Sequence, residues 1–598
     1  MPRKAFLGVE RSLSGQRWEE RLAEPRLALA LAQRHGLPEL VARILAGRGV
    51  ALDAAEAFLE PRLRALLPDP LGLAGMAEAV ARLLRAVEGG EKIVVFGDYD
   101  VDGATSAALL LRFLRAAGVE AGFYIPDRER EGYGPNAPAL LKLKQQGAGV
   151  VVTVDCGITA FEPLAAARAA GLDVIVVDHH VAEPELPAAV AVINPNRLDQ
   201  APLPGDADLR LGQLAAVGVC FLVAVALNRA LREAGWYATR AEPDLLQLLD
   251  LVALGTICDV VPLSGLNRAL VSQGLKVLAA RGNIGLAALA DAARLGEPPE
   301  AYHAGFLLGP RINAGGRLGA ADLGTRLLIE SDPAEAARFA AQLSRLNEER
   351  RAIEQGVQEA AIAAFEAGQA AQGLAFAAGI GWHPGVIGIV AGRLRERSGL
   401  PALVIALDEQ GTGKGSGRSV PGVDLGAAVI AARQAGLLIN GGGHPMAAGL
   451  TVARDKLDAL RDFLDRRLAA RIAEIAYRPA LGFDGALDPR AAEPALLESI
   501  ERCGPFGSGN PAPRFALPAT RIARADVVGA NHVRCILGGA GGGRLKAIAF
   551  RAMDSALGPA LLQSAGLPYH LAGKLKRDRW NGREGVQFII EDAARPTG

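Results

Sequence analysis

The sequence predicts an α/β protein that has a parallel sheet covered by helices, then a long helix, a smaller α/β domain and a C-terminal β-barrel. Three observations lead to this fold class. Strands and helices alternate from Lys92 to Asp178, one helical stretch fills 333–368, and short strands with Gly and Pro turns follow residue 476. The 598 residues also exceed what one hydrophobic core can organise, since cores stop growing at about 250–300 residues.

The first α/β domain is predicted from four apolar strands and the helices between them. The expected strands are 93–96, 119–125, 149–155 and 172–178, and the expected helices are 104–118, 135–147 and 161–171. Each strand is a continuous apolar run rather than an alternation of polar and apolar residues. Such runs are typical of a parallel sheet with both faces covered.

The remaining segments give the other domains. Residues 373–379 and 400–407 are expected strands with a helix at 385–397 between them, and five short strands near the end suit an OB-type barrel. We therefore expect five regions. They are an N-terminal helical region (1–75), the parallel-sheet domain (76–330), a connecting long helix (331–370), a smaller α/β domain (371–475) and an OB-like nucleic-acid-binding barrel (476–598).

The composition limits the classes of function. Lys plus Arg and Asp plus Glu are 65 each, so there is no global field to attract nucleic acid and any polyanion site must be local. The five cysteines form no C-x-x-C pair, which argues against a disulfide framework or a thiolate zinc site and favours a reducing compartment.

The first 20 residues lack a signal-peptide core, and the longest apolar run, 214–227, is shorter than the ~20 residues of a membrane span. We expect a cytoplasmic protein without membrane contact.

Acidic and imidazole side chains gather where three predicted strands end. They are Asp98, Asp100 and Asp102 just past the first strand, Asp155 as the last residue of the third, and Asp178, His179 and His180 at the end of the fourth. In open parallel sheets, ligands bind outside the carboxyl ends of the strands, so these side chains are expected to share one crevice. Asp100 and Asp102 are expected to point into it from an extended turn, with Val101 turned away. Close carboxylates repel each other unless cations neutralise them, and carboxylate with imidazole suits Mn²⁺ or Mg²⁺. A single such Asp is usually a helix cap, but three converging elements predict a centre for two divalent ions.

Four segments resemble, in order, the motifs of the DHH phosphoesterase family. They are GDYDVDGATS (97–106), VTVDCG (152–157), VVDHH (176–180) and GTICDVVPL (255–263). The tract GGGHPMAAG (441–449) is similar to part of the accessory DHHA1 domain of that family. The resemblance implies a metal-dependent phosphoesterase with a DHH domain, a DHHA1 domain and two bound ions.

The same resemblance implies the roles of individual residues. Asp100 and Asp102 would hold one ion each, Asp155 would bridge both, and His179 with Asp259 would complete the shell of the second ion. Asp259 follows from the resemblance alone, because its helical surroundings give no signal. His180 is expected to contact the phosphate or polarise the nucleophile, and Asp178 to orient its neighbours. Phe96 occupies a position where other branches carry a metal-binding His, so Asp98 or water is expected to take that place.

Further stretches resemble the RecJ branch, whose members are single-strand-specific 5′→3′ DNA exonucleases. They are IPDREREGYG (125–134), GPRINAGGRLG (309–319), GKGSGRSV (413–420) and CGPFGSGNPAPRF (503–515). This resemblance implies hydrolysis of phosphodiesters from the 5′ end, release of 5′-mononucleotides, and a place in DNA repair and recombination. It implies single-stranded DNA as the partner of a monomeric enzyme, with single-strand-binding protein and a RecQ-type helicase as further partners.

Candidate DNA contacts follow from the same stretches. They are Arg128, Tyr133, Arg311, Arg317, Ser416, Arg418 and His444. Arg forks beside small residues suit phosphate groups, and a Tyr can stack on a base. We expect Arg128, Ser416 and Arg418 to grip the 5′ end and His444 to reach a phosphate. In the barrel, a basic group beside an aromatic suits either a single-strand platform or a solvated hairpin; it comprises Lys574, Lys576, Arg577, Arg579 and Trp580.

Two other functions remain open. The chain could be a DHH phosphodiesterase for short oligonucleotides or cyclic dinucleotides, or an inactive nucleic-acid-binding relative. Phe96 and the additional barrel weigh against the first alternative. The complete set of Asp and His ligands weighs against the second, because a decayed site loses ligands.

Overall fold

The computed structural model describes residues 4–128, 130–205, 209–368, 372–475, 479–539, 542–564, 566–580 and 583–596. The chain divides into two compact units. Unit 1 comprises Met1–Ile312, Ala321–Ala340 and Ala480–Gly598, and unit 2 comprises Asn313–Ala320 and Ala341–Pro479. Each unit has hydrophobic cores of its own.

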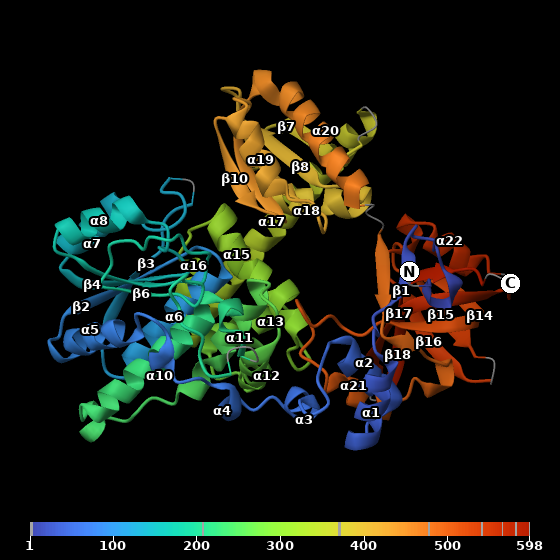
Figure 1. Ribbon diagram of the computed structural model, residues 1–598, viewed down its shortest axis with the longest axis horizontal. Helices are drawn as coiled ribbons and strands as arrows, with labels where there is room; N and C mark the ends of the chain where they lie inside the picture. The colour runs from blue at the N-terminus through green and yellow to red at the C-terminus, as the bar shows by residue number, and fades with distance from the viewer. Residues whose placement is uncertain are drawn as a thin grey trace. The chain divides into compact units, whose positions relative to one another are not determined.

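Unit 1 contains the predicted parallel sheet, whose five strands are in the order β3-β2-β4-β5-β6 (Figure 1). The strands are β2 (Lys92–Gly97), β3 (Ala121–Tyr124), β4 (Ala148–Val154), β5 (Asp173–Val177) and β6 (Ala191–Ile193). All pairings are parallel, which confirms the predicted sheet. Strand β6 was not predicted, because three residues are too few to show a period.

Helices cover both faces of this sheet (Figure 1). Helices α7 (Ala137–Gln145) and α8 (Phe161–Ala169) bury one apolar side each against β2, β4 and β5. The opposite face carries α5 (Met76–Glu88), α6 (Val101–Ala116) and α10 (Ala216–Glu233). Behind α6 lie α11 (Leu249–Cys258) and α12 (Gly265–Ala279), which pack side by side. The double cover explains the continuous apolar strands.

The end of unit 1 is the predicted barrel. Its strands are β14 (Phe515–Val528), β15 (His532–Gly538), β16 (Arg544–Ala549), β17 (Pro568–Trp580) and β18 (Arg583–Ala594). The order β14-β15-β16-β18-β17 closes on itself because β17 also pairs with β14. The five strands are those predicted, and their ring arrangement confirms a closed barrel. A short β13 (Gly485–Ala486) and the helices α21 (Pro494–Glu501) and α22 (Leu557–Leu562) flank it.

The N-terminal helices fold together with this barrel. They are α1 (Pro25–His35), α2 (Glu39–Gly47) and α3 (Ala55–Leu59), whereas α4 (Leu63–Leu66) packs against α12. Leu31 and Ile44 belong to the same buried cluster as Phe515 and Phe588 of the barrel. Strand β1 (Arg17–Glu20) pairs with β12 (Ala480–Phe483), so both ends of the chain build one core. Sequence patterns do not reveal this pairing, because its partners are distant along the chain.

A long helix joins the first unit to the second. The helix, α17, spans Pro333–Ala367, as its continuous helical pattern predicts, and follows α13 (Ile284–Ala292), α14 (Ala301–His303), α15 (Gly309–Leu318) and α16 (Leu323–Ile329). Its first turns belong to unit 1 and the remainder to unit 2.

Unit 2 contains a mixed sheet in the order β10-β11-β9-β8-β7. The strands are β7 (Ala375–Ile380), β8 (Ala402–Leu407), β9 (Thr412–Arg418), β10 (Asn440–His444) and β11 (Ala447–Ala453), with helices α18 (Ile387–Ser398), α19 (Leu425–Gln434) and α20 (Leu457–Ile475). Only β7 and β8 pair in parallel. The smaller α/β domain is thus confirmed, although β9 and β10 are strands despite their many glycines, which β-propensity disfavours.

Candidate metal centre

Helix α6 carries two candidate ligands in its first turn. Asp100 is the N-cap, and its Oδ1 accepts the Gly103 N–H at 3.0 Å. Asp102 is 1% exposed, and its carboxylate oxygens accept the N–H groups of Ala216 (2.7 Å) and Val217 (3.0 Å) at the start of α10. The expected extended turn was therefore wrong: capping by Asp100 starts the helix at Val101, so Asp102 is helical.

Asp155 lies directly after β4 in an unusual backbone conformation. Its φ is 59°, in the left-handed region that non-glycine residues seldom occupy, and it is 3% exposed. Its N–H donates to the Val177 carbonyl at 3.1 Å, and its own carbonyl accepts the Tyr133 hydroxyl at 2.9 Å. Such backbone strain persists where the surroundings impose it, and it is concentrated at functional sites.

His179 brings three acidic side chains together. Its Nε2 lies 3.3 Å from Asp155 Oδ1 and 4.0 Å from Asp102 Oδ2, and its Nδ1 lies 3.7 Å from Asp259 Oδ2. Nδ1 also lies 3.0 Å from the Leu214 carbonyl, which can only accept a hydrogen bond. This partner assigns the proton to Nδ1 and leaves Nε2 as a free ligand atom. Burial lowers the pKa of His179 to about 4, so the ring is neutral near pH 7.

Asp259 reaches the centre because α11 approaches α6 closely. A Cβ at Gly255 would lie 2.3 Å from Thr105 Oγ1 and 2.9 Å from Asp102 Oδ1. Only glycine fits there, and the close approach brings Asp259, at the end of α11, next to His179. No sequence pattern shows this arrangement, so Gly255 is not among the predicted residues.

Three overlapping groups of ligand atoms result, each with its atoms within 4.8 Å of one another. The groups are Asp155–His179–His180, Asp102–His179–Asp259 and Asp98–Asp100–Asp155. Asp98 Oδ1, His179 Nε2 and Asp259 Oδ2 are buried without a hydrogen-bond partner in the described part of the chain. Buried polar atoms normally have a hydrogen-bond partner, so these three atoms fit a site that binds cations.

The electrostatics lead to the same conclusion. Burial, and next the charge of Asp100, raise the pKa values of Asp98 and Asp259 to about 7. Burial and neighbouring carboxylates also raise the pKa values of Asp102 and Asp155 above their usual range. A divalent cation would offset this repulsion, and a set of carboxylates with one imidazole matches Mn²⁺ or Mg²⁺. The residues therefore fit divalent ions.

Asp178 and His180 form a charged pair beside the ligands. The fully buried Asp178 accepts the backbone N–H groups of Ile158, His179 and His180 and lies 2.7 Å from His180 Nδ1. Burial opposes the charge on both residues. Their mutual hydrogen bond and attraction outweigh burial, lowering the pKa of Asp178 and raising that of His180. Through these contacts Asp178 fixes the backbone of His179 and His180 and the ring orientation of His180.

Two asparagines that were not predicted support the same histidines. Asn196 Nδ2 donates to the His179 carbonyl at 2.6 Å, and Asn194 Nδ2 donates to the His180 carbonyl at 2.8 Å. Both follow β6, in the segment INPN. Polar residues at the end of one more parallel strand were the available signal, and it was missed together with β6.

The candidate DNA contacts of unit 1 differ in their position. Tyr133 is 53% exposed, and its ring lies 6.1 Å from that of His180, at the edge of the centre. Arg128 lies over the Tyr99 ring, 5.3 Å from its centroid, and Tyr99 stands between Asp98 and Asp100 in the sequence. Arg311 donates to the Leu307 carbonyl at 2.6 Å within its own helical segment.

In unit 2, Ser416 and Arg418 form a second polar site on β9. Arg418 Nη1 donates to Ser416 Oγ at 3.2 Å and to the Gly417 carbonyl at 2.8 Å. Burial, and next the charge of Arg395, lower the Arg418 pKa, and no described carboxylate is within ion-pair distance of it. A Cβ at Gly388, in the first turn of α18, would lie 3.0 Å from both the Ser416 hydroxyl and the Arg418 guanidinium. The absence of a side chain at Gly388 lets the Ser416 hydroxyl and the Arg418 guanidinium lie close to the first turn of α18.

The other unit 2 candidates lie on different elements. Arg317 donates to the Gly385 carbonyl, just before α18, and His444 is exposed at the end of β10. In the barrel of unit 1, Lys574 pairs with Glu591 and Arg577 with Glu501, while Lys576 is exposed. The side chains of Arg579 and Trp580 lie outside the described residues. Glu591 lies on the neighbouring strand β18 and Glu501 at the end of α21, so two of the basic residues are paired with acids of the barrel region.

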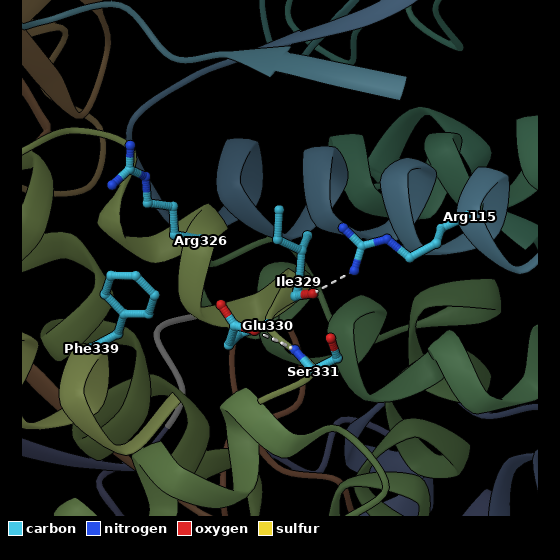
Figure 2. Close-up of a pocket in the computed structure, with 6 residues that line it drawn as sticks. All are labelled: Arg115, Arg326, Ile329, Glu330, Ser331 and Phe339. Atoms are coloured by element: carbon cyan, nitrogen blue, oxygen red, sulfur yellow. Dashed lines mark hydrogen bonds between the residues drawn. The ribbon is translucent and has the colours of Figure 1, made fainter. Parts of the chain in front are cut away.

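A separate pocket of about 550 Å³ opens where α6, α16 and α17 meet (Figure 2). Its lining residues are Arg115, Arg326, Ile329, Glu330, Ser331 and Phe339. Arg115 donates to the Ile329 carbonyl at 3.0 Å, and the Ser331 N–H donates to Glu330 at 2.8 Å. None of the candidate ligands lines this pocket. Among the described helices, none combines the length and the apolar character that crossing a membrane requires.

Comparisons with known proteins place the chain in a family. Family models match over residues 92–256 (DHH family, N-terminal domain), 371–470 (DHHA1 domain) and 483–592 (RecJ OB domain). The single-stranded-DNA-specific exonuclease RecJ of Dickeya dadantii is 39% identical over 578 residues, covering 93% of this chain and 96% of that protein.

Solved structures agree with these matches. The crystal structure of RecJ from Thermus thermophilus in complex with Mn²⁺ has a TM-score of 0.78 at 30% identity, covering 96% of this chain and 79% of that chain. The Mg²⁺ complex of RecJ from the same organism has a TM-score of 0.72 at 29% identity, with 96% and 78% covered. The resemblance stated from the motifs is confirmed: the chain belongs to the RecJ family.

Proposed function

We propose that this chain is a single-strand-specific DNA exonuclease that hydrolyses phosphodiesters from the 5′ end with two divalent metal ions and releases 5′-mononucleotides, in DNA repair and recombination. One observation carries the proposal: Asp155 and Asp259 meet around His179, and Asp259 Oδ2 and His179 Nε2 are buried without a hydrogen-bond partner among the described residues. The RecJ relatives are named for single-stranded-DNA-specific exonuclease activity.

The ligand set would be divided between two ions. Asp100, Asp102, Asp155, His179 and Asp259 would hold them, with Asp155 shared, since it belongs to two of the three ligand groups. Asp98 is close to Asp100 and Asp155 and would take the place of the histidine that Phe96 replaces. When bound, the ions supply Lewis-acid polarisation of the phosphodiester and lower the pKa of a water molecule.

Other residues of the chain would bind the DNA strand and supply positive charge to its phosphate groups. His180 is held by Asp178, whose hydrogen bond and charge raise the His180 pKa and so favour the charged imidazolium, and its ring would donate to a phosphoryl oxygen. The Tyr133 ring, exposed beside His180, would stack on a base. In unit 2, the half-buried Arg418 with Ser416 would bind the 5′-phosphate. Arg128 and Arg311 of unit 1, with Arg317 and His444 of unit 2, would contact the strand.

The setting of the activity is part of the same proposal. Single-stranded DNA is the substrate, and the chain would act as a monomer in the cytoplasm. Single-strand-binding protein and a RecQ-type helicase would supply and expose that substrate. The family resemblance supports these partners and this location.

The test is digestion of labelled oligonucleotides in Mn²⁺ or Mg²⁺. We expect single-stranded DNA to lose its 5′ label first, and Asp155→Ala to abolish hydrolysis. Asp53→Ala removes an exposed carboxylate from the N-terminal region and is the control with normal activity. Duplex DNA, dinucleotides and pyrophosphate complete the comparison. Full activity of Asp155→Ala, or a preference for dinucleotides, would contradict the proposal.

A further inference from the structure

The loop that follows Asp259 has a conformation that needs support. Val260 has φ 63°, a left-handed conformation that is a true outlier for a β-branched residue, and its side chain is 68% exposed. Its own side chain therefore contributes little packing to offset the strain. Backbone of this kind persists only where neighbouring structure imposes it. Such structure comes from residues 503–510, which precede the barrel.

Segment 503–510 packs directly on this loop. The Leu263 N–H donates to the Ser508 carbonyl at 2.8 Å. A Cβ at Gly507 would lie 2.7 Å from Leu263 Cδ1, and one at Gly509 would lie 2.8 Å from Pro262 Cβ and 3.1 Å from Pro262 Cα. The two glycines thus let the segment lie against Pro262 and Leu263 without a gap.

Segment 503–510 is itself held in shape. Asn510 Nδ2 donates to the Cys503 and Pro505 carbonyls, both at 2.9 Å, and closes the segment into a loop. Its Oδ1 accepts Arg48 Nε at 3.2 Å, and Arg48 pairs with the fully buried side chain of Asp484 at 2.7 Å. The segment is therefore fixed to the shared core of the N-terminal helices and the barrel.

A buried arginine fixes the other end of the Asp259 loop to the same segment. Arg268, in α12, is 3% exposed and donates to the Cys503 carbonyl at 2.9 Å and to the Phe58 carbonyl at 2.9 Å. Its guanidinium also lies 4.0 Å from the centroid of the Phe58 ring. The loop between α11 and α12 is thus held by hydrogen bonds at Leu263 and at Arg268. Their partners are Ser508 and Cys503 in the C-terminal part of the chain and Phe58 in the N-terminal part.

We propose that segment 503–510 is a positioning element that holds Asp259 in place for metal binding, so that the C-terminal part of the chain sets the metal affinity of the catalytic domain. The inference rests on the proposed metal centre. It assigns to this segment a role separate from DNA binding by the barrel. Residues that orient a ligand from behind typically change metal affinity about 10–100-fold when altered.

The test measures Mn²⁺ binding to the full chain without DNA, by the electron paramagnetic resonance of free Mn²⁺. Gly509→Ala places a methyl group against the rigid Pro262 ring, and we expect its weakest Kd for Mn²⁺ to rise about 10-fold. Gly529→Ala is the matched control: its φ of 62° resembles the 68° of Gly509, but its Cβ meets only His532 Cδ2, at 3.7 Å. The control shares the backbone strain and should bind Mn²⁺ as the unaltered chain does.

A second variant keeps the test decisive if Gly509→Ala fails to fold. Gly507→Ala meets the end of the flexible Leu263 side chain, so its effect on Kd should have the same sign and be smaller. Thermal unfolding without metal identifies variants that are folded. Folded Gly509→Ala or Gly507→Ala with an unchanged Mn²⁺ Kd would overturn the inference while leaving the metal centre intact. If the unaltered chain binds no Mn²⁺, the proposed function itself fails.

Discussion

Gly255→Ala tests whether the approach of α11 to α6 sets up the metal centre. The added Cβ would lie 2.3 Å from Thr105 Oγ1, 2.8 Å from Val217 Cγ1 and 2.9 Å from Asp102 Oδ1. Favourable contacts need about 3.5 Å, so the helices must separate by roughly 1 Å. Helix α11 has little room to move away from α6, because α12 packs against its opposite side. The two helices are in close contact there, at Gly274 of α12 and the Leu249 backbone of α11.

The magnitude follows from two opposing effects. Alanine in place of glycine within a helix gains about 0.5–1 kcal/mol, whereas overpacking a buried site costs about 1–3 kcal/mol. We therefore expect a net loss of stability of up to about 2 kcal/mol. Metal ligation tolerates errors of only about 0.2 Å, so a shift of α11 should weaken Mn²⁺ binding through Asp259 by at least ~10-fold.

The assay is thermal unfolding with and without Mn²⁺, together with a Mn²⁺ titration. Gly356→Ala, in helix α17, is the control, because its Cβ would meet nothing within 4 Å. It should gain stability slightly and bind Mn²⁺ normally. If Gly255→Ala binds Mn²⁺ as tightly as the unaltered chain, α11 does not position Asp259 in the way argued above.

Two further predictions concern pH and the 5′ end. Asp98 and Asp259 have pKa values raised to about 7 in the metal-free protein, so the folded state binds protons that the unfolded state releases near pH 4. The melting temperature of metal-free protein should therefore fall as the pH rises from about 4 to about 7 and then level off. Saturating Mn²⁺ should remove this fall, and a flat metal-free profile would contradict the assigned pKa shifts. Arg418→Ala should reduce the preference for a 5′-phosphorylated over a 5′-hydroxyl strand about 10-fold, by loss of one charge-assisted contact, in competition digests. The exposed Arg454→Ala is the control in those digests, and an unchanged preference would remove Arg418 from the 5′ pocket.

Much of the architecture could be predicted from local patterns. The continuous apolar runs at β2, β4 and β5 predicted a parallel sheet, and the carboxyl ends of such strands lie at one edge whatever the rest of the chain does. Asp155 and His179 could therefore be placed together from strand direction alone. The strands of the barrel were predicted for a similar reason, since alternation and turn residues are local signals.

Other features depended on contacts between distant segments. Asp259 lies at the end of a buried helix without a distinctive pattern, and its position depends on the space left at Gly255. The glycines of β9 are unfavourable in a strand, yet a Cβ at Gly415 would meet the Leu450 side chain of the neighbouring strand, so glycine is what allows the two strands to pack there.

The sequence by itself thus determined the parallel sheet, the ligand types and the edge where they gather, because these depend on period, residue chemistry and strand direction. Only the tertiary structure decided how the N-terminal helices join the barrel, how α11 reaches α6, and which segment supports the Asp259 loop. These features rest on close packing between residues far apart in the chain, and a one-dimensional pattern carries no record of which distant surfaces fit together.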